Sequence, residues 1–158
     1  MEFISRNVEQ TRRLGMRFGA LIGIGDIFFL QGDLGSGKTT FVQGVAAGWG
    51  SLDQVSSPTF VLANVYRRLD GQRLYHLDAY RLNSAVEAED LDLDAMLESG
   101  PLVIEWAERI QEALPGERLF FQMRWIDELQ RDMVITACGS RFQEILLAVR
   151  RQIYGVSG

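Results

Sequence analysis

Residues 32–44 read GDLGSGKTTFVQG, and this stretch decides the fold. It meets the pattern G-x-x-x-x-G-K-[ST] of a phosphate-binding loop, or P-loop. The matching positions are Gly32, Gly37, Lys38 and Thr39. An apolar run at residues 26–31 predicts a buried strand before the loop, and residues 38–49 predict a helix after it. This order of strand, glycines and helix is the context that distinguishes a P-loop from a glycine-rich turn.

The composition of the loop follows from what it has to bind. Backbone N–H groups must turn inward around a phosphate, and larger side chains would block that approach. The N-terminus of the following helix adds positive dipole charge. Lys38 can reach the β- and γ-phosphates, and the Thr39 hydroxyl can bind Mg²⁺. We therefore expect a nucleoside triphosphate and Mg²⁺ to bind at Asp33, Leu34, Gly35, Ser36, Gly37, Lys38, Thr39 and Thr40.

The rest of the chain predicts further strands and helices. Ser5 is expected to cap a first helix that reaches about Leu21 and is ended by Gly23 and Gly25. Asp70-Gly71 predicts a tight hairpin turn. Further strands are predicted at residues 59–69, 72–77, 102–106, 119–126 and 133–138, and further helices at residues 84–97 and 140–154.

These elements predict an α/β fold. We expect a three-layer P-loop NTPase sandwich, with central parallel strands flanked by antiparallel hairpin strands and with helices on both faces. The 158 residues are the length of one domain, so residues 1–158 are assigned to a single P-loop ATPase domain. Residues from about 140 to 158 are expected to form a helical tail at its C-terminal end.

Charge and composition argue against several classes of protein. The 16 basic and 21 acidic side chains give a net charge of −5, which disfavours a free-standing nucleic-acid binder. Cys138 is the only cysteine, so an internal disulfide is excluded. The first ten residues contain no apolar signal region, and the longest apolar run, residues 20–30, is too short to cross a bilayer. We expect a cytoplasmic protein without a membrane partner.

Two acidic side chains follow predicted strands. Asp78, in HLDAYRL, lies just past one strand, and Glu105, in VIEW, lies at the end of another. In open α/β sheets, ligands bind at the carboxyl ends of the strands, so both acids can face the phosphates rather than lie exposed in loops. Thr59, in SSPTF, can act as a switch that senses the γ-phosphate, although Ser-Pro-Thr is also common in turns.

Four segments in this order, GDLGSGKTT, SSPTF, HLDAYRL and IEWAERI, resemble the TsaE family. These are bacterial P-loop ATPases of tRNA threonylcarbamoyladenosine (t6A) biosynthesis. The resemblance implies Mg²⁺-dependent ATP hydrolysis that regulates the t6A transferase complex and resets it between turnovers. The implied partners are a TsaD-like transferase subunit and its non-catalytic TsaB-like paralogue. Contact with tRNA is expected only through that complex, and the chain alone is expected to be a monomer or weak oligomer.

The resemblance also implies a role for individual side chains. Lys38 contacts the phosphates and, with Glu105, is expected to be catalytic, Glu105 by assisting hydrolysis. Thr39 and Asp78 hold Mg²⁺. Thr59 is the switch threonine. One further residue, Trp106, matches a family tryptophan that lies near the nucleotide.

Other functions remain open from the residues alone. A small-molecule or nucleoside kinase is the main alternative, although no arginine-rich lid sequence lies between Gly100 and Gly116. A GTPase is disfavoured because no Asn-Lys-x-Asp segment is present, and a non-hydrolysing interaction module is disfavoured by Glu105. The only histidine, His76, is expected to have a structural role beside Asp78 rather than a role in proton transfer. Arg81 as a transition-state arginine stays open, and Trp49 and Trp125 are expected to pack.

Overall fold

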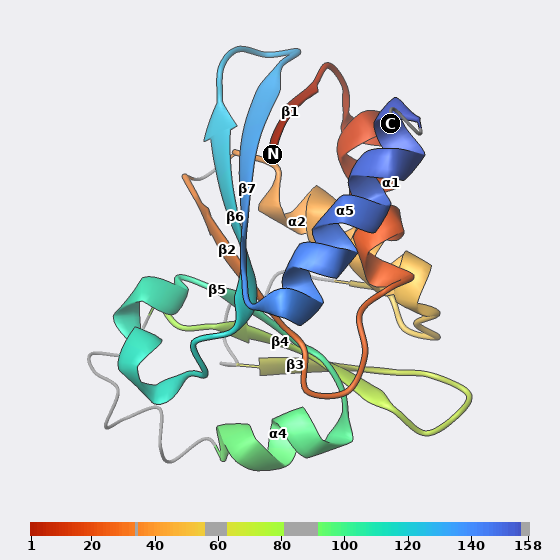
Figure 1. Ribbon diagram of the computed structural model, residues 1–158, viewed down its shortest axis with the longest axis vertical. Helices are drawn as coiled ribbons and strands as arrows, with labels where there is room; N and C mark the ends of the chain where they lie inside the picture. The colour runs from red at the N-terminus through yellow and green to blue at the C-terminus, as the bar shows by residue number, and fades with distance from the viewer. Residues whose placement is uncertain (34, 56–62, 81–91, 156–158) are drawn as a thin grey trace.

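A computed structural model describes residues 1–33, 35–55, 63–80 and 92–155, and these contain a mixed sheet flanked by helices (Figure 1). The strands are β1 (Glu2–Ser5), β2 (Ile27–Gly32), β3 (Ala63–Arg67), β4 (Arg73–Asp78), β5 (Leu102–Glu105), β6 (Arg118–Trp125) and β7 (Arg131–Cys138). The helices are α1 (Val8–Gly19), α2 (Lys38–Trp49), α4 (Leu93–Ser99) and α5 (Ser140–Tyr154), with 3₁₀ turns at Ala107–Arg109 and Gln111–Ala113.

The sheet order among the described strands is β1-β7-β6-β2-β5-β4-β3. The four central strands, β6, β2, β5 and β4, run parallel to one another. Antiparallel strands extend the sheet at both edges. At one edge β3 pairs with β4, and at the other β7 pairs with β6 and β1 pairs with β7. The P-loop strand β2 is central, and its residues from Ile27 to Leu30 are at most 2% exposed. A continuous apolar run suits a strand covered on both faces, which is the predicted α/β architecture.

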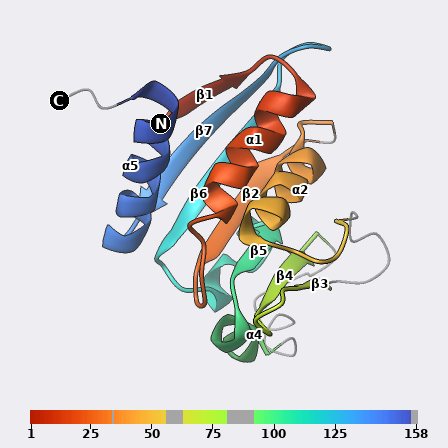
Figure 2. The same ribbon diagram turned by 90° about the vertical axis from the view of Figure 1, so that its right-hand side faces the viewer.

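Each face of the sheet has its own apolar core. Helices α1, α2 and α5 lie on one face (Figure 2), and the core beneath them contains Phe18, Phe28, Phe41 and Phe121. The other face of β2, β5 and β4 packs on α4 and the 3₁₀ turns through residues that include Leu93 and Ile110. The two layers of helix and turn confirm the prediction of helices on both faces. In the described part of the chain, no helix is long and apolar enough to span a membrane.

Glycines allow α1 and α2 to approach each other closely. A Cβ atom added to Gly44 would lie 2.0 Å from the carbonyl oxygen of Arg12, and one added to Gly48 would lie 2.1 Å from that of Met16. Gly15 and Gly19 of α1 meet the backbone of α2 in the same way. No other residue type has room at this crossing, so the position of α2, and with it the P-loop, depends on these glycines.

The prediction for the first helix was wrong in two respects, its N-terminal cap and its C-terminal end. Ser5 does not cap the first helix; it ends β1, and its hydroxyl bonds the Thr11 hydroxyl at 2.6 Å. The helix cap is Asn7, whose side chain accepts a hydrogen bond from the backbone N–H of Gln10. The helix also ends earlier than expected, at Gly19. In β1, Glu2 and Ile4 are exposed. The strand lies at the edge of the sheet, where it pairs with β7.

The other element predictions hold within the described residues. The helices at 38–49 and 140–154 have the predicted bounds, and α5 packs Phe142, Ile145 and Val149 into the core. The expected strand at 59–69 includes β3, and the expected helix at 84–97 overlaps α4. Residues 56–62 and 81–91 lie outside the described residues.

Candidate nucleotide-binding site

The P-loop connects the end of β2 at Gly32 to the start of α2 at Lys38. Gly35 and Gly37 have φ angles of 81° and 101°, in the left-handed region that glycine adopts without strain. The backbone N–H of Ser36 donates to the carbonyl of Asp33 at 3.0 Å, which closes the loop on itself. The predicted binding residue Leu34 lies outside the described residues.

Several features of this loop fit a bound phosphate. Gly37 caps α2 without any side-chain hydrogen bond, and the first turn of the helix carries no acidic residue. The Ser36 hydroxyl is buried and has no hydrogen-bond partner among the described residues. Thr39 and Thr40 lie on the first turn of α2, half-buried. A helix N-terminus with uncapped N–H groups and an unpaired hydroxyl suits an anion such as a triphosphate.

Lys38 lies at the mouth of the loop with its charge close to three groups. Its Nζ donates to the carbonyl oxygen of Gly32 at 2.6 Å and lies 3.9 Å from Oε1 of Glu105. It also lies 4.8 Å from the ring centroid of Trp106. The side chain is 12% exposed, so the ammonium is held where it can meet an incoming phosphate.

Asp78 and Glu105 are neighbours across the sheet. Asp78 ends β4, Glu105 ends β5, and the two are paired in the parallel register. Paired residues of adjacent strands project to the same face, so both carboxylates lie on the side of the P-loop lysine. Asp78 Oδ1 accepts the backbone N–H of Tyr80 at 2.9 Å, which fixes that carboxylate.

These oxygens are the ligands that Mg²⁺ prefers. The Thr39 hydroxyl and the Asp78 carboxylate would hold the ion. Mg²⁺ keeps several waters and takes substrate phosphates as ligands, so it does not need a cage of side chains. Residues 1–33, 35–55, 63–80 and 92–155 contain no group of three or more His, Cys, Asp and Glu side chains that could hold a metal.

His76 is joined to Glu105 and not to Asp78, which corrects the expected partner. Its Nε2 lies 2.6 Å from Oε2 of Glu105, and its Nδ1 lies 3.0 Å from the Tyr66 hydroxyl. The imidazole is fully buried. No sequence motif predicts this contact, because it depends on the register of β4 and β5.

Trp106 has an unusual backbone conformation. Its φ of 61° is one of two positive values among the non-glycine residues that the structure describes. The ring centroids of Trp106 and Tyr80 are 5.0 Å apart. The guanidinium carbon of Arg109 lies over the Tyr80 ring, 4.8 Å from its centroid. Backbone strain of this kind concentrates at functional sites. Tyr80 belongs to the HLDAYRL segment, and Trp106 and Arg109 belong to IEWAERI, so this cluster brings the two segments into contact.

Arg131 is a residue of the site that the sequence did not indicate. Its Nε donates to the carbonyl oxygen of Gly35 at 2.9 Å, although the two residues are 96 positions apart. Its guanidinium also lies 5.8 Å from the ring centroid of Trp125. The packing role expected for Trp125 is only partly met, because its side chain is 48% exposed; Trp49, at 3%, packs as predicted.

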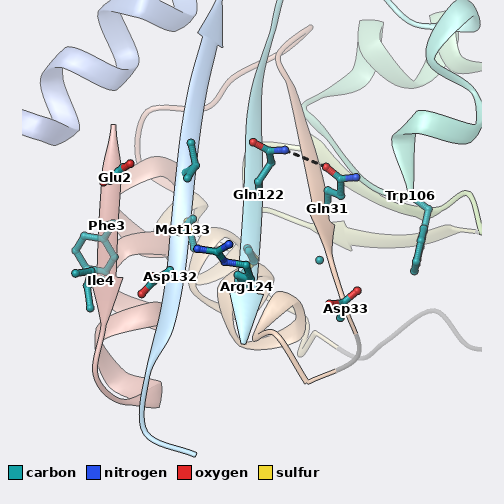
Figure 3. A pocket seen from close by; sticks show the side chains of 13 residues that line it. Glu2, Phe3, Ile4, Gln31, Asp33, Trp106, Gln122, Arg124, Asp132 and Met133 are labelled. Atoms are coloured by element: carbon teal, nitrogen blue, oxygen red, sulfur yellow. Dashed lines mark hydrogen bonds between the residues drawn. The ribbon is translucent and has the colours of Figure 1, made fainter. Parts of the chain in front are cut away.

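A hollow of about 530 Å³ opens beside the loop, over β1, β7, β6 and β2 (Figure 3). Asp33 and Trp106 border it. Gln31 and Gln122 also line it from the neighbouring strands β2 and β6, and Nε2 of Gln122 donates to Oε1 of Gln31 at 3.4 Å. The hollow reaches only the edge of the P-loop, so the phosphate site is defined by the loop itself. The switch candidate Thr59 and the possible transition-state residue Arg81 lie outside the described residues.

Comparisons with known proteins identify the family of the chain. The family model for threonylcarbamoyl adenosine biosynthesis protein TsaE matches residues 5–133. The tRNA threonylcarbamoyladenosine biosynthesis protein TsaE of Bacillus subtilis is 40% identical over 139 residues, which is 87% of this chain and 85% of that protein. The protein of the same name from Streptomyces coelicolor is 42% identical over 138 residues, 83% of this chain and 93% of that protein.

A solved structure supports the fold as well. The crystal structure of YdiB from Bacillus subtilis matches with a TM-score of 0.80 and 31% sequence identity, over 97% of this chain and 95% of that one. The family model covers most of the chain, and relatives with about 40% identity cover most of its length. The chain therefore belongs to the TsaE family of threonylcarbamoyl adenosine biosynthesis proteins.

Proposed function

We propose that this chain is a Mg²⁺-dependent ATPase that binds and regulates the complex that transfers the threonylcarbamoyl group in t6A biosynthesis. ATP hydrolysis resets that complex between turnovers. The observation that carries the proposal is the position of Lys38, whose Nζ lies between the P-loop carbonyl of Gly32 and the carboxylate of Glu105. The cytoplasmic location expected from the sequence is part of the same proposal.

The side chains divide the work of hydrolysis. The P-loop N–H groups and Lys38 bind the triphosphate and offset charge on the transferred phosphoryl group. Thr39 and Asp78 would hold Mg²⁺, which would supply further charge neutralisation on the phosphate oxygens. Glu105 orients the attacking water and accepts its proton, while the bond from the γ-phosphorus to the bridging oxygen of ADP breaks.

The proposed partners are the TsaD-like and TsaB-like proteins. Membership of the TsaE family supports a role in threonylcarbamoyl adenosine biosynthesis. The size of the chain and its net charge of −5 support a role that works through a partner rather than through independent tRNA binding. Trp106, Tyr80 and Arg109 form a cluster beside Lys38 that extends from the nucleotide site to the surface, since Tyr80 is 51% exposed. A partner that contacts this cluster would sense the nucleotide.

The proposal is tested by phosphate release from Mg²⁺-ATP, measured for the purified chain alone and with the TsaD-like and TsaB-like proteins. We expect release to rise when both partners are present. Glu105→Gln, which keeps the shape of the side chain, should bind ATP normally and hydrolyse it about 100-fold or more slowly. Lys38→Ala should instead weaken ATP binding, because it removes the charge that faces the phosphates.

Two results would contradict the proposal. Unchanged phosphate release in both variants would mean that this site does not hydrolyse ATP. Efficient transfer of phosphate to a nucleoside or another small metabolite by the isolated chain would favour the kinase alternative.

A further inference from the structure

A buried hydrogen-bonded chain runs from β3 to the proposed catalytic carboxylate. The Tyr66 hydroxyl lies 3.0 Å from His76 Nδ1, and His76 Nε2 lies 2.6 Å from Oε2 of Glu105. Tyr66 is 3% exposed, His76 0% and Glu105 7%. Polar groups this deeply buried need partners, and His76 has one at each ring nitrogen.

The chemistry of the three groups fixes the direction of the hydrogen bonds. A carboxylate can only accept, so Nε2 of His76 carries the proton and donates to Glu105. In a neutral imidazole the other nitrogen is then an acceptor, which receives the proton of the Tyr66 hydroxyl. Because the Tyr66 hydroxyl can donate or accept, the tautomer of His76 is set by Glu105, and Tyr66 holds the second ring nitrogen in place.

The same contact orients the carboxylate toward the P-loop. With Oε2 held by His76, the second oxygen of Glu105 lies 3.9 Å from Nζ of Lys38. On the sheet, His76 pairs with Val103, which lies two positions before Glu105. Because side chains alternate between the two faces of a strand, His76 lies on the same face of the sheet as the Glu105 carboxylate. His76 is fully buried there and acts on the nucleotide site only through Glu105.

We propose that His76 is a positioning residue for ATP hydrolysis, which holds Glu105 so that its free oxygen faces the phosphate site, and that Tyr66 fixes the orientation of the imidazole through Nδ1. This inference rests on the proposed ATPase function. Partners that orient a functional side chain in this way usually change activity 10- to 100-fold when they are lost.

The first test does not require activity. His76 is the only histidine, so ¹⁵N-histidine labelling gives a single imidazole in the NMR spectrum. We expect the Nε2–H tautomer in the wild type and a clear change of the Nε2 resonance in Glu105→Ala. The Nδ1–H tautomer, or an Nε2 resonance that is the same in Glu105→Ala, would overturn the inference.

The second test separates positioning from folding. His76→Leu should lower kcat about 10- to 100-fold and leave the Kd for ATP within about twofold, because His76 does not face the nucleotide. His76→Gln, whose amide N–H can replace Nε2, should recover part of kcat, and Tyr66→Phe should fall between the wild type and His76→Leu. Val103→Ala, in the same core without any of these hydrogen bonds, is the control for lost packing and should keep its kcat.

The outcomes distinguish this inference from the proposed function. If Glu105→Gln abolishes hydrolysis while His76→Leu and His76→Gln both match the wild type, the positioning role is wrong and the ATPase stands. A similar loss in His76→Leu, His76→Gln and Val103→Ala would also overturn it, since the effect would then follow from the core. If the wild type with its partners does not release phosphate, the ATPase proposal fails and the positioning role fails with it.

Discussion

Arg131 donates a hydrogen bond from Nε to the carbonyl oxygen of Gly35, 2.9 Å away, and so connects strand β7 to the P-loop. The Nη1 group of the same side chain donates to the backbone carbonyls of Asp127 and Gln130, in the turn between β6 and β7. One guanidinium thus holds the P-loop and the turn between β6 and β7 in a fixed relative position. Gly35, with its positive φ, has no side chain of its own that could do this.

Arg131→Ala is expected to weaken ATP binding about tenfold, which is the loss of one charge-assisted hydrogen bond that holds the loop in its binding conformation. Arg131→Lys should not restore binding, because lysine lacks the forked donors that reach both the loop and the turn. Calorimetric titration with a non-hydrolysable ATP analogue measures the change. Arg124→Ala, an exposed arginine on the same hairpin, is the control. Equal affinity in Arg131→Ala and Arg124→Ala would show that the contact with Gly35 does not support the loop.

Asp78→Asn should reduce the affinity for ATP only when Mg²⁺ is present. The amide keeps the shape of the side chain and can still accept the Tyr80 N–H, but it lacks the charge that favours the ion. We expect a loss of about tenfold or more with Mg²⁺ and no difference from the wild type with excess EDTA. Asp94→Asn, on the first turn of α4, is a control with the same chemical change outside the site. A loss that is the same with and without the metal would contradict a role through Mg²⁺.

Trp106 allows a test of backbone strain at the site. A left-handed conformation costs an ordinary residue about 1–2 kcal/mol, and glycine avoids this cost. Trp106→Gly and Trp106→Ala both remove the ring that packs near Tyr80 and Lys38. The glycine variant should nevertheless be the more stable of the two by about 1 kcal/mol, measured from urea unfolding midpoints. The reverse order would mean that the backbone relaxes out of this conformation when the ring is lost.

The sequence predicted those parts of the fold that depend on local signals. The P-loop helix has the expected bounds because Gly37 begins it and Gly50, with a φ of 102°, ends it. The hairpin at Asp70-Gly71 was recognisable because its turn requires glycine, which has a φ of 87°. The segment Glu2–Ser5 carries no such signal: it is short, and only its pairing with β7 makes it a strand.

The sequence motifs named the candidate residues of the site but not the contacts between them. Lys38 and Glu105 could be named from motifs, yet the partner of His76 depends on the β4–β5 register and that of Gly35 on the order of the strands. Such contacts join distant positions, and no local pattern encodes them. Thr59 and Arg81 lie outside the described residues, so their roles stay predictions.

Asp53 provides a pH-dependent test of the loop that follows α2. Hydrogen bonds from the side chain and backbone of Arg67 lower the pKa of the Asp53 carboxyl from 3.8 to about 2. A carboxyl whose pKa is lower in the folded state stabilises that state above pH 3.8, and this contribution is lost as the pH falls through about 2. Asp53→Asn should therefore be less stable than the wild type at pH 6, and the difference should shrink below pH 3.8. Urea midpoints at a series of pH values measure it, and a difference that stays constant down to pH 2.5 or so would contradict the ion pair.

Gly44→Ala should destabilise the protein even though alanine is the better helix former. In an open helix this change stabilises by about 1 kcal/mol. Here the new Cβ would lie 2.0 Å from the carbonyl oxygen of Arg12, so α1 and α2 must move apart. Overpacking of this kind costs about 1–3 kcal/mol, which exceeds the gain in helix propensity.

The matched control is Ala47→Gly, on the exposed side of the same helix. It should lower the free energy of unfolding by about 1 kcal/mol through helix propensity alone, since nothing packs on that side chain as closely. Urea unfolding followed by circular dichroism gives both values. Because α2 begins at the P-loop, Gly44→Ala should also weaken ATP binding, whereas Ala47→Gly should not. A Gly44→Ala variant that is as stable as the wild type, or more so, would show that helix propensity outweighs the close approach and that the crossing can widen without cost.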